Sequence, residues 1–242
     1  ATICLSVQSG CRMGCRFCMT ARQGFQGNLT VNEILNQFRS LPEHASLTNI
    51  VFMGMGEPLD NLEEVLRSLE ILTSDWGYGW SPSRITVSTI GITGKIEAFL
   101  SKSRCHLAVS LHSPFDSERQ SLMPAQKAHP VKEVLDTIRG FDFGKQRRVS
   151  FEYILFEGLN DTPRHVKELA RILNGIKCRI NLIRFHKVPG SSYSSPGDKE
   201  VFEFKEALVA KGILTTIRAS RGVDIQAACG LLSTLEQNKS SQ

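Results

Sequence analysis

The sequence lacks the features that mark several classes of protein. No apolar run approaches the roughly 18 residues of a membrane-spanning helix, so no membrane association is expected. The first ten residues contain no basic residue and no long apolar core, so no secretory signal is recognisable and we expect a cytoplasmic protein. Internal repeats are also absent, which excludes coiled-coil and collagen-like chains, and a hydrophobic content of 41% excludes a disordered one.

Linkers and low-complexity stretches are lacking as well, so the 242 residues predict one domain. We expect a catalytic domain over residues 1–236 and a polar tail over residues 237–242. The chain starts without Met and within a strand-like pattern, so we expect further residues upstream. Residues 1–121 carry 10 Lys and Arg against 11 Asp and Glu, and residues 122–242 carry 19 against 13. This basic excess indicates an anionic partner or, equally, a solvated basic face.

Short apolar runs typical of buried parallel strands alternate with runs of helical periodicity. The expected strands are residues 2–7, 50–53, 84–88, 107–111, 149–155, 180–185 and 215–218. The expected helices are residues 30–39, 61–72, 95–100, 131–138, 164–173 and 199–209. This alternation predicts right-handed β-α-β crossovers in an α/β fold. About six units fit, fewer than the eight of a closed barrel, so we predict an incomplete (β/α)6 TIM-like barrel, with a doubly wound open sheet as the alternative.

Seven cysteines are present, an odd number that argues against a disulfide framework. Cys11, Cys15 and Cys18 lie within eight residues, so their thiolates can converge on one metal centre. Three ligands would leave one iron of a four-iron cluster open to a substrate. A zinc loop is the alternative, with His106 as a conceivable fourth ligand.

Glycine and polar residues follow several of the expected strands. The carboxyl ends of the strands carry the ligand site in a β/α barrel. Gly54 and Gly56 there would allow close backbone approach, although a tight turn needs the same residues. The carboxylate of Glu57 would accept a hydrogen bond from an ammonium group.

The cysteine motif, with Phe17 before its last cysteine, resembles the signature of radical S-adenosylmethionine (SAM) enzymes. Further motifs in the same order, over residues 2 to about 234, resemble the RlmN/Cfr family of RNA adenosine methyltransferases, and RlmN members most closely. These motifs are Gly24–Phe25, Asn28–Thr30, Phe52–Pro58, Val87–Gly91, Ser110–His112, Leu122–Pro124, Asn181–Ile183 and Asp224–Gly230.

The resemblance implies a radical SAM barrel with a [4Fe-4S] cluster on Cys11, Cys15 and Cys18 and with two SAM molecules used per turnover. It implies methylation of C2 of an adenosine in 23S rRNA and in some tRNAs, with methylation of C8 as the alternative. The implied SAM contacts are Gly56, Glu57, Ser88, Ser110, Leu111, His112 and His186. His186 stands where the family has Asn, and Asn181 is the other candidate.

The resemblance also assigns chemistry to two isolated cysteines. Cys229 would become S-methylated, and Cys4 would release the product by forming a disulfide with Cys229. Cys105 and Cys178 are expected to be inert buried residues. Two other classes stay open: an activase that makes protein radicals, which needs neither Cys4 nor Cys229, and an RNA-binding module with a structural cluster, which cleaves no SAM.

The implied partners are RNA and a one-electron donor such as flavodoxin or ferredoxin, and a monomer is expected. Members of the family usually carry an N-terminal RNA-binding domain and an acidic residue ahead of the Cys4 position; both would precede residue 1. The candidate phosphate-binding residues are Lys145, Arg147, Arg148, Arg184, Lys187, Arg218 and Arg221.

Overall fold

A sheet of seven parallel strands forms the centre of the computed structural model, which describes residues 1–144, 149–218 and 231–232. The strands lie side by side in the order in which they occur along the chain, β1-β4-β5-β6-β7-β8-β9. Their bounds are β1 Thr2–Cys4, β4 Asn49–Phe52, β5 Ile85–Thr89, β6 His106–Ser110, β7 Val149–Leu155, β8 Cys178–Arg184 and β9 Leu214–Ile217. All seven strands predicted from the sequence are confirmed, most of them to within two residues.

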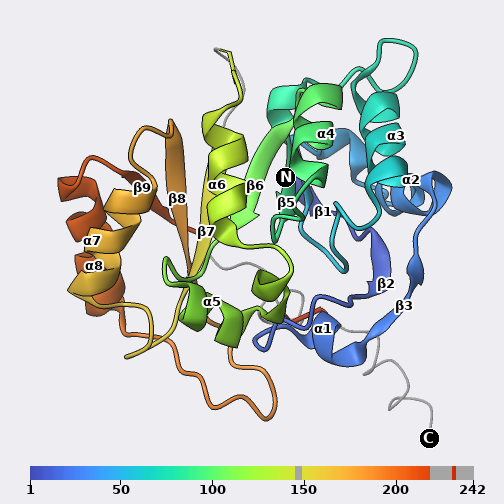
Figure 1. Cartoon of the computed structure of the whole chain (residues 1–242). Helices are drawn as coiled ribbons and strands as arrows, with labels where there is room; N and C mark the ends of the chain where they lie inside the picture. Colours follow the sequence, from blue (N-terminus) through green and yellow to red (C-terminus); the bar gives the residue numbers. More distant parts are fainter. Residues whose placement is uncertain (145–148, 219–230, 233–242) are drawn as a thin grey trace, which may run out of the picture.

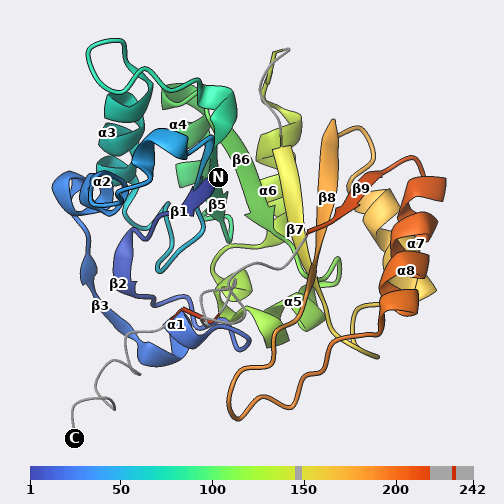
Figure 2. The ribbon, with the colours of Figure 1, turned by 180° about the vertical axis from the view of Figure 1, so that it is seen from behind.

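Each crossover between neighbouring strands contains at least one helix. These helices are α2 Val31–Arg39, α3 Leu62–Thr73, α4 Lys95–Lys102, α5 Asp116–Leu122, α6 Val131–Arg139, α7 Pro163–Ile172 and α8 Asp198–Ala210. The strand order never reverses, so there is no topological switch point and the doubly wound alternative is wrong. Figure 1 shows α3, α4 and α6 in front of the strands, and Figure 2 shows the sheet from its other side. The predicted incomplete barrel is confirmed.

The connection from β1 to β4 holds elements that the sequence did not indicate. An antiparallel pair, β2 Gln8–Gly10 and β3 Phe25–Asn28, encloses the short helix α1 Met19–Gln23. The same connection holds a single turn of 3-10 helix at His44–Ser46. Two further turns of this kind lie later in the chain, at Pro82–Arg84 and Pro124–Lys127. Figure 1 shows α1 and the β2–β3 pair at the same end of the sheet as α5. This extra hairpin places the segment between β2 and α1 beside the carboxyl ends of the strands.

The helix ends follow from local sequence. At α2, the Thr30 hydroxyl accepts a hydrogen bond from the Glu33 amide, and the Glu33 carboxylate accepts one from the Thr30 amide. This capping box makes Thr30 the N-cap and begins the helix at Val31, one residue after the predicted start. Its inner face buries Ile34, Leu35 and Phe38 against the sheet.

The core lies between the sheet and its helices. Every residue of β7 is buried, as expected for a central strand of a parallel sheet covered on both sides. Within the described parts of the chain, none of the helices is both long and apolar enough to cross a membrane.

Candidate active site at the strand ends

A cavity opens at the carboxyl ends of the strands, and most of the predicted site residues line it. Its wall combines the loop before α1 with the ends of successive strands. The predicted residues in its lining are Cys11, Cys15, Cys18, Gly54, Gly56, Glu57, Ser88, Ser110 and His112. The lining also contains Thr89, Met123, Glu152, Ile154, Ile183, Arg218 and Leu232. Residues separated by more than 200 positions therefore meet around one space.

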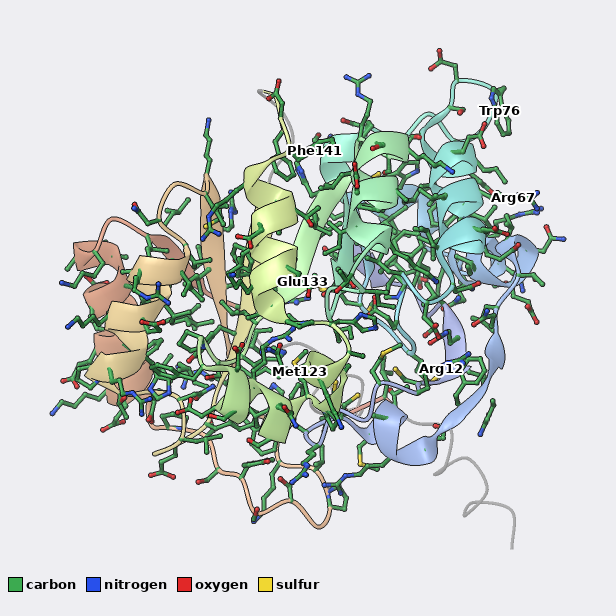
Figure 3. All side chains as sticks on the ribbon, viewed as in Figure 1. Arg12, Arg67, Trp76, Met123, Glu133 and Phe141 are labelled. Atoms are coloured by element: carbon green, nitrogen blue, oxygen red, sulfur yellow. The ribbon has the colours of Figure 1, made fainter. Side chains whose placement is uncertain are left out.

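The cysteine loop is fixed to its surroundings by backbone hydrogen bonds and by one buried ring. The Cys11 amide donates to the Gly24 carbonyl at 3.1 Å, and the Arg16 amide donates to the Leu122 carbonyl at 3.0 Å. Phe17 is buried among the core residues, with 8% of its surface exposed, and it also lines the cavity. Figure 3 shows Met123, which follows Leu122, at this end of the molecule. The aromatic residue of the motif thus anchors the loop in the core and, with the cysteines, lines the cavity.

The donor set fits an iron–sulfur cluster better than a single ion. Within the described residues, no three His, Cys, Asp or Glu side chains lie close enough together to hold one metal ion. The predicted alternative of a zinc loop is therefore not supported, and His106 lies at the amino end of β6, away from the strand ends. In a four-iron cluster each thiolate binds a different iron atom, so three cysteines spread around one cavity suit it.

Burial controls the protonation of these thiols. It raises the pKa of Cys11 to about 12 and the pKa of Cys15 well above its usual value, and the nearby Cys18 and Glu57 raise both further. Thiols in this setting stay protonated unless a positively charged centre binds them.

Glu57 is buried in the loop that follows β4 and is held by three donors. Its Oε1 accepts hydrogen bonds from the Thr89 hydroxyl and from the Leu59 amide at 3.0 Å, and its Oε2 accepts one from the Ile90 amide at 2.9 Å. Burial raises the pKa of this carboxyl to about 7, and the three hydrogen bonds oppose that shift. One lone pair of Oε2 remains for a ligand, which suits a cationic group.

The glycines around Glu57 are required by packing within the protein. A Cβ atom on Gly54 would lie 2.6 Å from the Ser6 Oγ and 2.8 Å from the backbone of Leu5. Gly56 has a φ of +98°, and a Cβ atom there would lie 2.5 Å from the Cβ of Gln8. The turn therefore needs glycine for its contact with the chain after β1, as the alternative reading of this motif proposed.

His112 is a buried histidine with a fixed tautomer. Its φ of 56° makes it the one non-glycine residue with a positive φ in the part of the chain that the structure describes. Nδ1 accepts a hydrogen bond from the Ile154 amide at 3.0 Å, so the ring proton lies on Nε2. Burial, together with the charge of Arg119, lowers the pKa to about 3. His112 is therefore a neutral hydrogen-bond donor in the cavity wall.

Arg119, on α5, is a site residue that the sequence analysis missed. It is 1% exposed, and its guanidinium donates to the carbonyls of Ile90, Ser110 and Leu111 at 2.7, 2.9 and 3.2 Å, and to the side chain of Gln126. Burial lowers its pKa to about 10, so it stays charged at neutral pH. This one side chain joins the ends of β5 and β6, where Ser88, Ser110 and His112 lie.

Glu152 is the second residue that was missed. It lies in the middle of β7, where its Oε1 accepts hydrogen bonds from Asn181 at 2.7 Å and Ser150 at 3.0 Å. Its Oε2 is buried and has no hydrogen-bond partner. The charged residue in the apolar run of residues 149–155 was the available signal, because buried strands exclude unpaired charge.

The remaining predicted residues lie elsewhere. The Leu111 side chain is fully buried, and its amide and carbonyl bond to Glu152 and Arg119. His186 follows β8, half-buried and outside the cavity lining. Cys4 ends β1 with an exposed side chain. Cys229, Lys145, Arg147, Arg148 and Arg221 lie outside the described residues.

Two of the predicted phosphate-binding residues have other partners. Arg184 pairs with Asp198 at 2.5 Å, and Arg218 lines the cavity. Lys187 is exposed. Cys105 is 1% exposed, so its predicted burial is confirmed, whereas Cys178 is only partly buried, and this burial raises its pKa to about 11.

Known proteins resemble the chain over its whole length. Residues 5–172 match the model of the Radical SAM superfamily. A "Probable dual-specificity RNA methyltransferase RlmN" of Porphyromonas gingivalis is 61% identical over 242 residues, which are 100% of this chain and 71% of that protein. A "Dual-specificity RNA methyltransferase RlmN" of Syntrophus aciditrophicus is 47% identical, covering 96% of this chain and 68% of that protein.

A solved structure shows the same likeness in three dimensions. The crystal structure of a radical SAM methyltransferase from Sphaerobacter thermophilus superposes with a TM-score of 0.90 at 41% sequence identity. The match covers 95% of this chain and 69% of that one.

Proposed function

The chain belongs to the radical SAM superfamily and, within it, to the RlmN family of RNA methyltransferases, and on this basis we propose that it methylates C2 of an adenosine in 23S ribosomal RNA and in some transfer RNAs. The family carries a [4Fe-4S] cluster and uses SAM. The RNA substrates would be met in the cytoplasm, and a flavodoxin or ferredoxin would supply the electron.

One observation carries the proposal: the three cysteines of the cluster motif line the same cavity as five of the seven implied SAM contacts, namely Gly56, Glu57, Ser88, Ser110 and His112. Cys11, Cys15 and Cys18 would hold the cluster at one wall. Glu57 would accept a hydrogen bond from the SAM ammonium through the free lone pair of Oε2. His112 would donate from Nε2 to the same ligand.

Cys229 is the residue proposed to carry the methyl group. Three residues after it, Leu232 lines the cavity, and its carbonyl accepts a hydrogen bond from the Thr20 hydroxyl at 2.7 Å. This contact ties the chain just beyond Cys229 to α1, beside the cysteine loop. A thiol delivered there as thiolate would attack the methyl carbon of one SAM molecule, displace S-adenosylhomocysteine and become S-methylcysteine.

C2 of adenine is electrophilic, so it cannot attack a SAM methyl group directly. The reduced cluster, when bound, supplies a 5′-deoxyadenosyl radical from a second SAM molecule. The S-methyl group of Cys229 would give up a hydrogen atom to that radical, its carbon would bond to C2 of the base, and the adduct would then lose the C2 proton and return one electron to the cluster. The Cys4 thiolate would attack the sulfur of Cys229, so that the S–S bond forms as the S–C bond breaks, and the released carbon would take up a proton to give the methyl group of the free RNA. The exposed side chain of Cys4 suits this role.

The direct test is the identity of the methylated nucleoside. The protein, with its cluster assembled anaerobically, is incubated with SAM, a reductant and 23S rRNA or tRNA, and the RNA is digested for mass spectrometry. 2-Methyladenosine is expected. 8-Methyladenosine would show the Cfr-like reaction instead, and the absence of any methylated adenosine would reject the proposal.

A further inference from the structure

Four polar side chains form a continuous layer across the second half of the sheet. The strand register pairs Ser110 of β6 with Glu152 of β7, Glu152 with Asn181 of β8, and Asn181 with Thr216 of β9. Paired residues of neighbouring parallel strands point to the same face. The Thr216 hydroxyl donates to Asn181 Oδ1 at 2.8 Å, and Asn181 Nδ2 donates to Glu152 Oε1 at 2.7 Å. The layer therefore runs from an implied SAM contact to the edge strand of the sheet.

The two oxygens of Glu152 differ in one decisive respect. Oε1 is satisfied by Asn181 and Ser150, whereas Oε2 is buried without a hydrogen-bond partner and belongs to a side chain in the cavity wall. A buried carboxylate oxygen without a hydrogen bond is costly, because the water removed from it is not replaced, and the ion pair that Oε2 makes with Arg218 at 3.8 Å supplies no hydrogen bond. A ligand that donates a hydrogen bond at this point would remove that cost.

A donor lies beside this acceptor. Nη1 of Arg218 forms an ion pair with Glu152 Oε2 at 3.8 Å and lies 3.1 Å from the sulfur of Met53, and the side chain of Arg218 is one-third exposed. Arg218 directly follows β9, at the open edge of the sheet. The cavity wall thus offers a carboxylate oxygen and a guanidinium next to each other.

We propose that Glu152 and Arg218 recognise the adenine of the RNA substrate by its N6–N7 edge. Glu152 Oε2 accepts a hydrogen bond from the 6-amino group, and Arg218 donates one to N7. Adenine presents this pair of groups, whereas guanine places an acceptor, O6, where the carboxylate would repel it. The edge lies across the six-membered ring from C2, so this orientation leaves C2 free to react.

The inference rests on the proposed function. It is supported by the position of Glu152 and Arg218 in the cavity, on the side opposite three of the implied SAM contacts. These three contacts lie on the cysteine side: Glu57 follows β4, Ser88 is near the end of β5, and His112 follows β6. Glu152 and Arg218 lie on the other side, on β7 and after β9. A flipped-out base that enters the cavity near the edge strand β9 would reach Glu152 and Arg218 first. SAM would lie further in, on the cysteine side.

The test compares two RNA substrates in one holoenzyme assay. One RNA carries adenosine at the methylated position, and the other carries purine riboside, which lacks the 6-amino group. The readout is kcat/KM for the adenosine RNA divided by kcat/KM for the purine riboside RNA. This ratio is measured for the parent, for Glu152→Gln and for Ser150→Ala. In Glu152→Gln, the hydrogen bonds of Asn181 and Ser150 hold the amide oxygen at Oε1 and place the NH2 group where Oε2 was. Ser150→Ala removes one bond to Oε1 and leaves Oε2 unchanged.

The parent should prefer adenosine, Ser150→Ala should keep that preference, and Glu152→Gln should lower the ratio about 10-fold or more, the range of a hydrogen bond to a charged group. An equal loss on both RNAs in Glu152→Gln, with the ratio retained, would make the residue structural and overturn the inference. An unchanged Glu152→Gln enzyme would overturn it too. If the parent with an intact cluster methylates neither RNA, the proposed function itself fails.

Discussion

The ring of Phe17 packs edge-on against the imidazole of His112, with ring centroids 4.9 Å apart. Phe17 belongs to the cysteine loop, and His112 follows β6, so this contact joins the two halves of the site. The centroid of the same Phe17 ring also lies 5.7 Å from that of Phe156. The position of the cysteines relative to the SAM contacts therefore depends on a buried aromatic cluster in the cavity wall.

Replacing Phe17 by Ala should loosen the cysteine loop. We expect the free energy of unfolding to fall by about 3 kcal/mol, the lower end for a buried Phe, and the reconstituted protein to retain less iron. Urea unfolding and iron analysis measure the two effects. Phe25→Ala is the control, because Phe25 lies in the neighbouring β3 with 37% of its surface exposed. Equal iron retention in Phe17→Ala and the parent would contradict the anchoring role.

Replacing Arg119 by Met should destabilise the protein strongly. The carbonyls of Ile90, Ser110 and Leu111 would lose their buried donor, and we expect a loss of about 3–5 kcal/mol in urea unfolding of the metal-free protein. Arg67→Met, on the exposed face of α3 (Figure 3), should change stability by less than about 0.5 kcal/mol. A small effect of Arg119→Met would show that water or other groups can satisfy these carbonyls.

Glu57 should make the metal-free protein less stable as the pH rises. Its pKa is about 7 in the folded chain and near 4.5 when unfolded, so between these values the folded state holds a proton that the unfolded state has lost. The contribution of Glu57 is therefore full below pH 4.5 and declines up to pH 7.

The variant Glu57→Gln lacks this dependence. The free energy of unfolding of the variant minus that of the parent should rise between pH 4.5 and 7, by at most about 1.4 kcal/mol per pH unit. Chemical unfolding at a series of pH values gives the curve. A flat difference would mean that Glu57 is ionised in the folded protein throughout this range.

Replacing Cys4 by Ala should trap the protein on its RNA substrate. Without the thiol that attacks Cys229, the bond between Cys229 and the methylated base should persist, and a covalent adduct should accumulate on denaturing gels. Cys178→Ala, a cysteine without an assigned role, should turn over without an adduct. Normal turnover by Cys4→Ala would reject the role of Cys4.

Much of the fold was predictable because buried parallel strands appear in the sequence as short continuous apolar runs. The run at residues 149–155 is apolar apart from Ser150 and Glu152, and β7 forms there residue for residue. The pair β2–β3 was missed because strands of three and four residues, with Gly10 and Gly27 within them, are too short to show a period. The first strand ends at Cys4, short of residue 7, because the chain turns there toward that pair.

Site residues that belong to a sequence motif could be predicted. Site residues that are defined only by their packing could not. Cys11, Cys15, Cys18 and Glu57 stand in motifs, and the structure brings them to one cavity. Arg119 stands in an otherwise ordinary amphipathic stretch, and its partners are backbone carbonyls, which no sequence pattern displays. The sequence could not show why Gly54 and Gly56 are glycines. Close approach of a ligand and close packing against Leu5 or Gln8 both require a residue without a Cβ atom.

Methylation of Cys229 is the chemical centre of the account, and it can be observed without RNA. The protein is reconstituted with iron and sulfide under anaerobic conditions, incubated with SAM, and analysed by intact-protein and peptide mass spectrometry, with Cys229→Ala as the control. The account predicts one added methyl group, located on Cys229 and absent from the control. An unmodified Cys229 in a sample whose cluster is intact would contradict it.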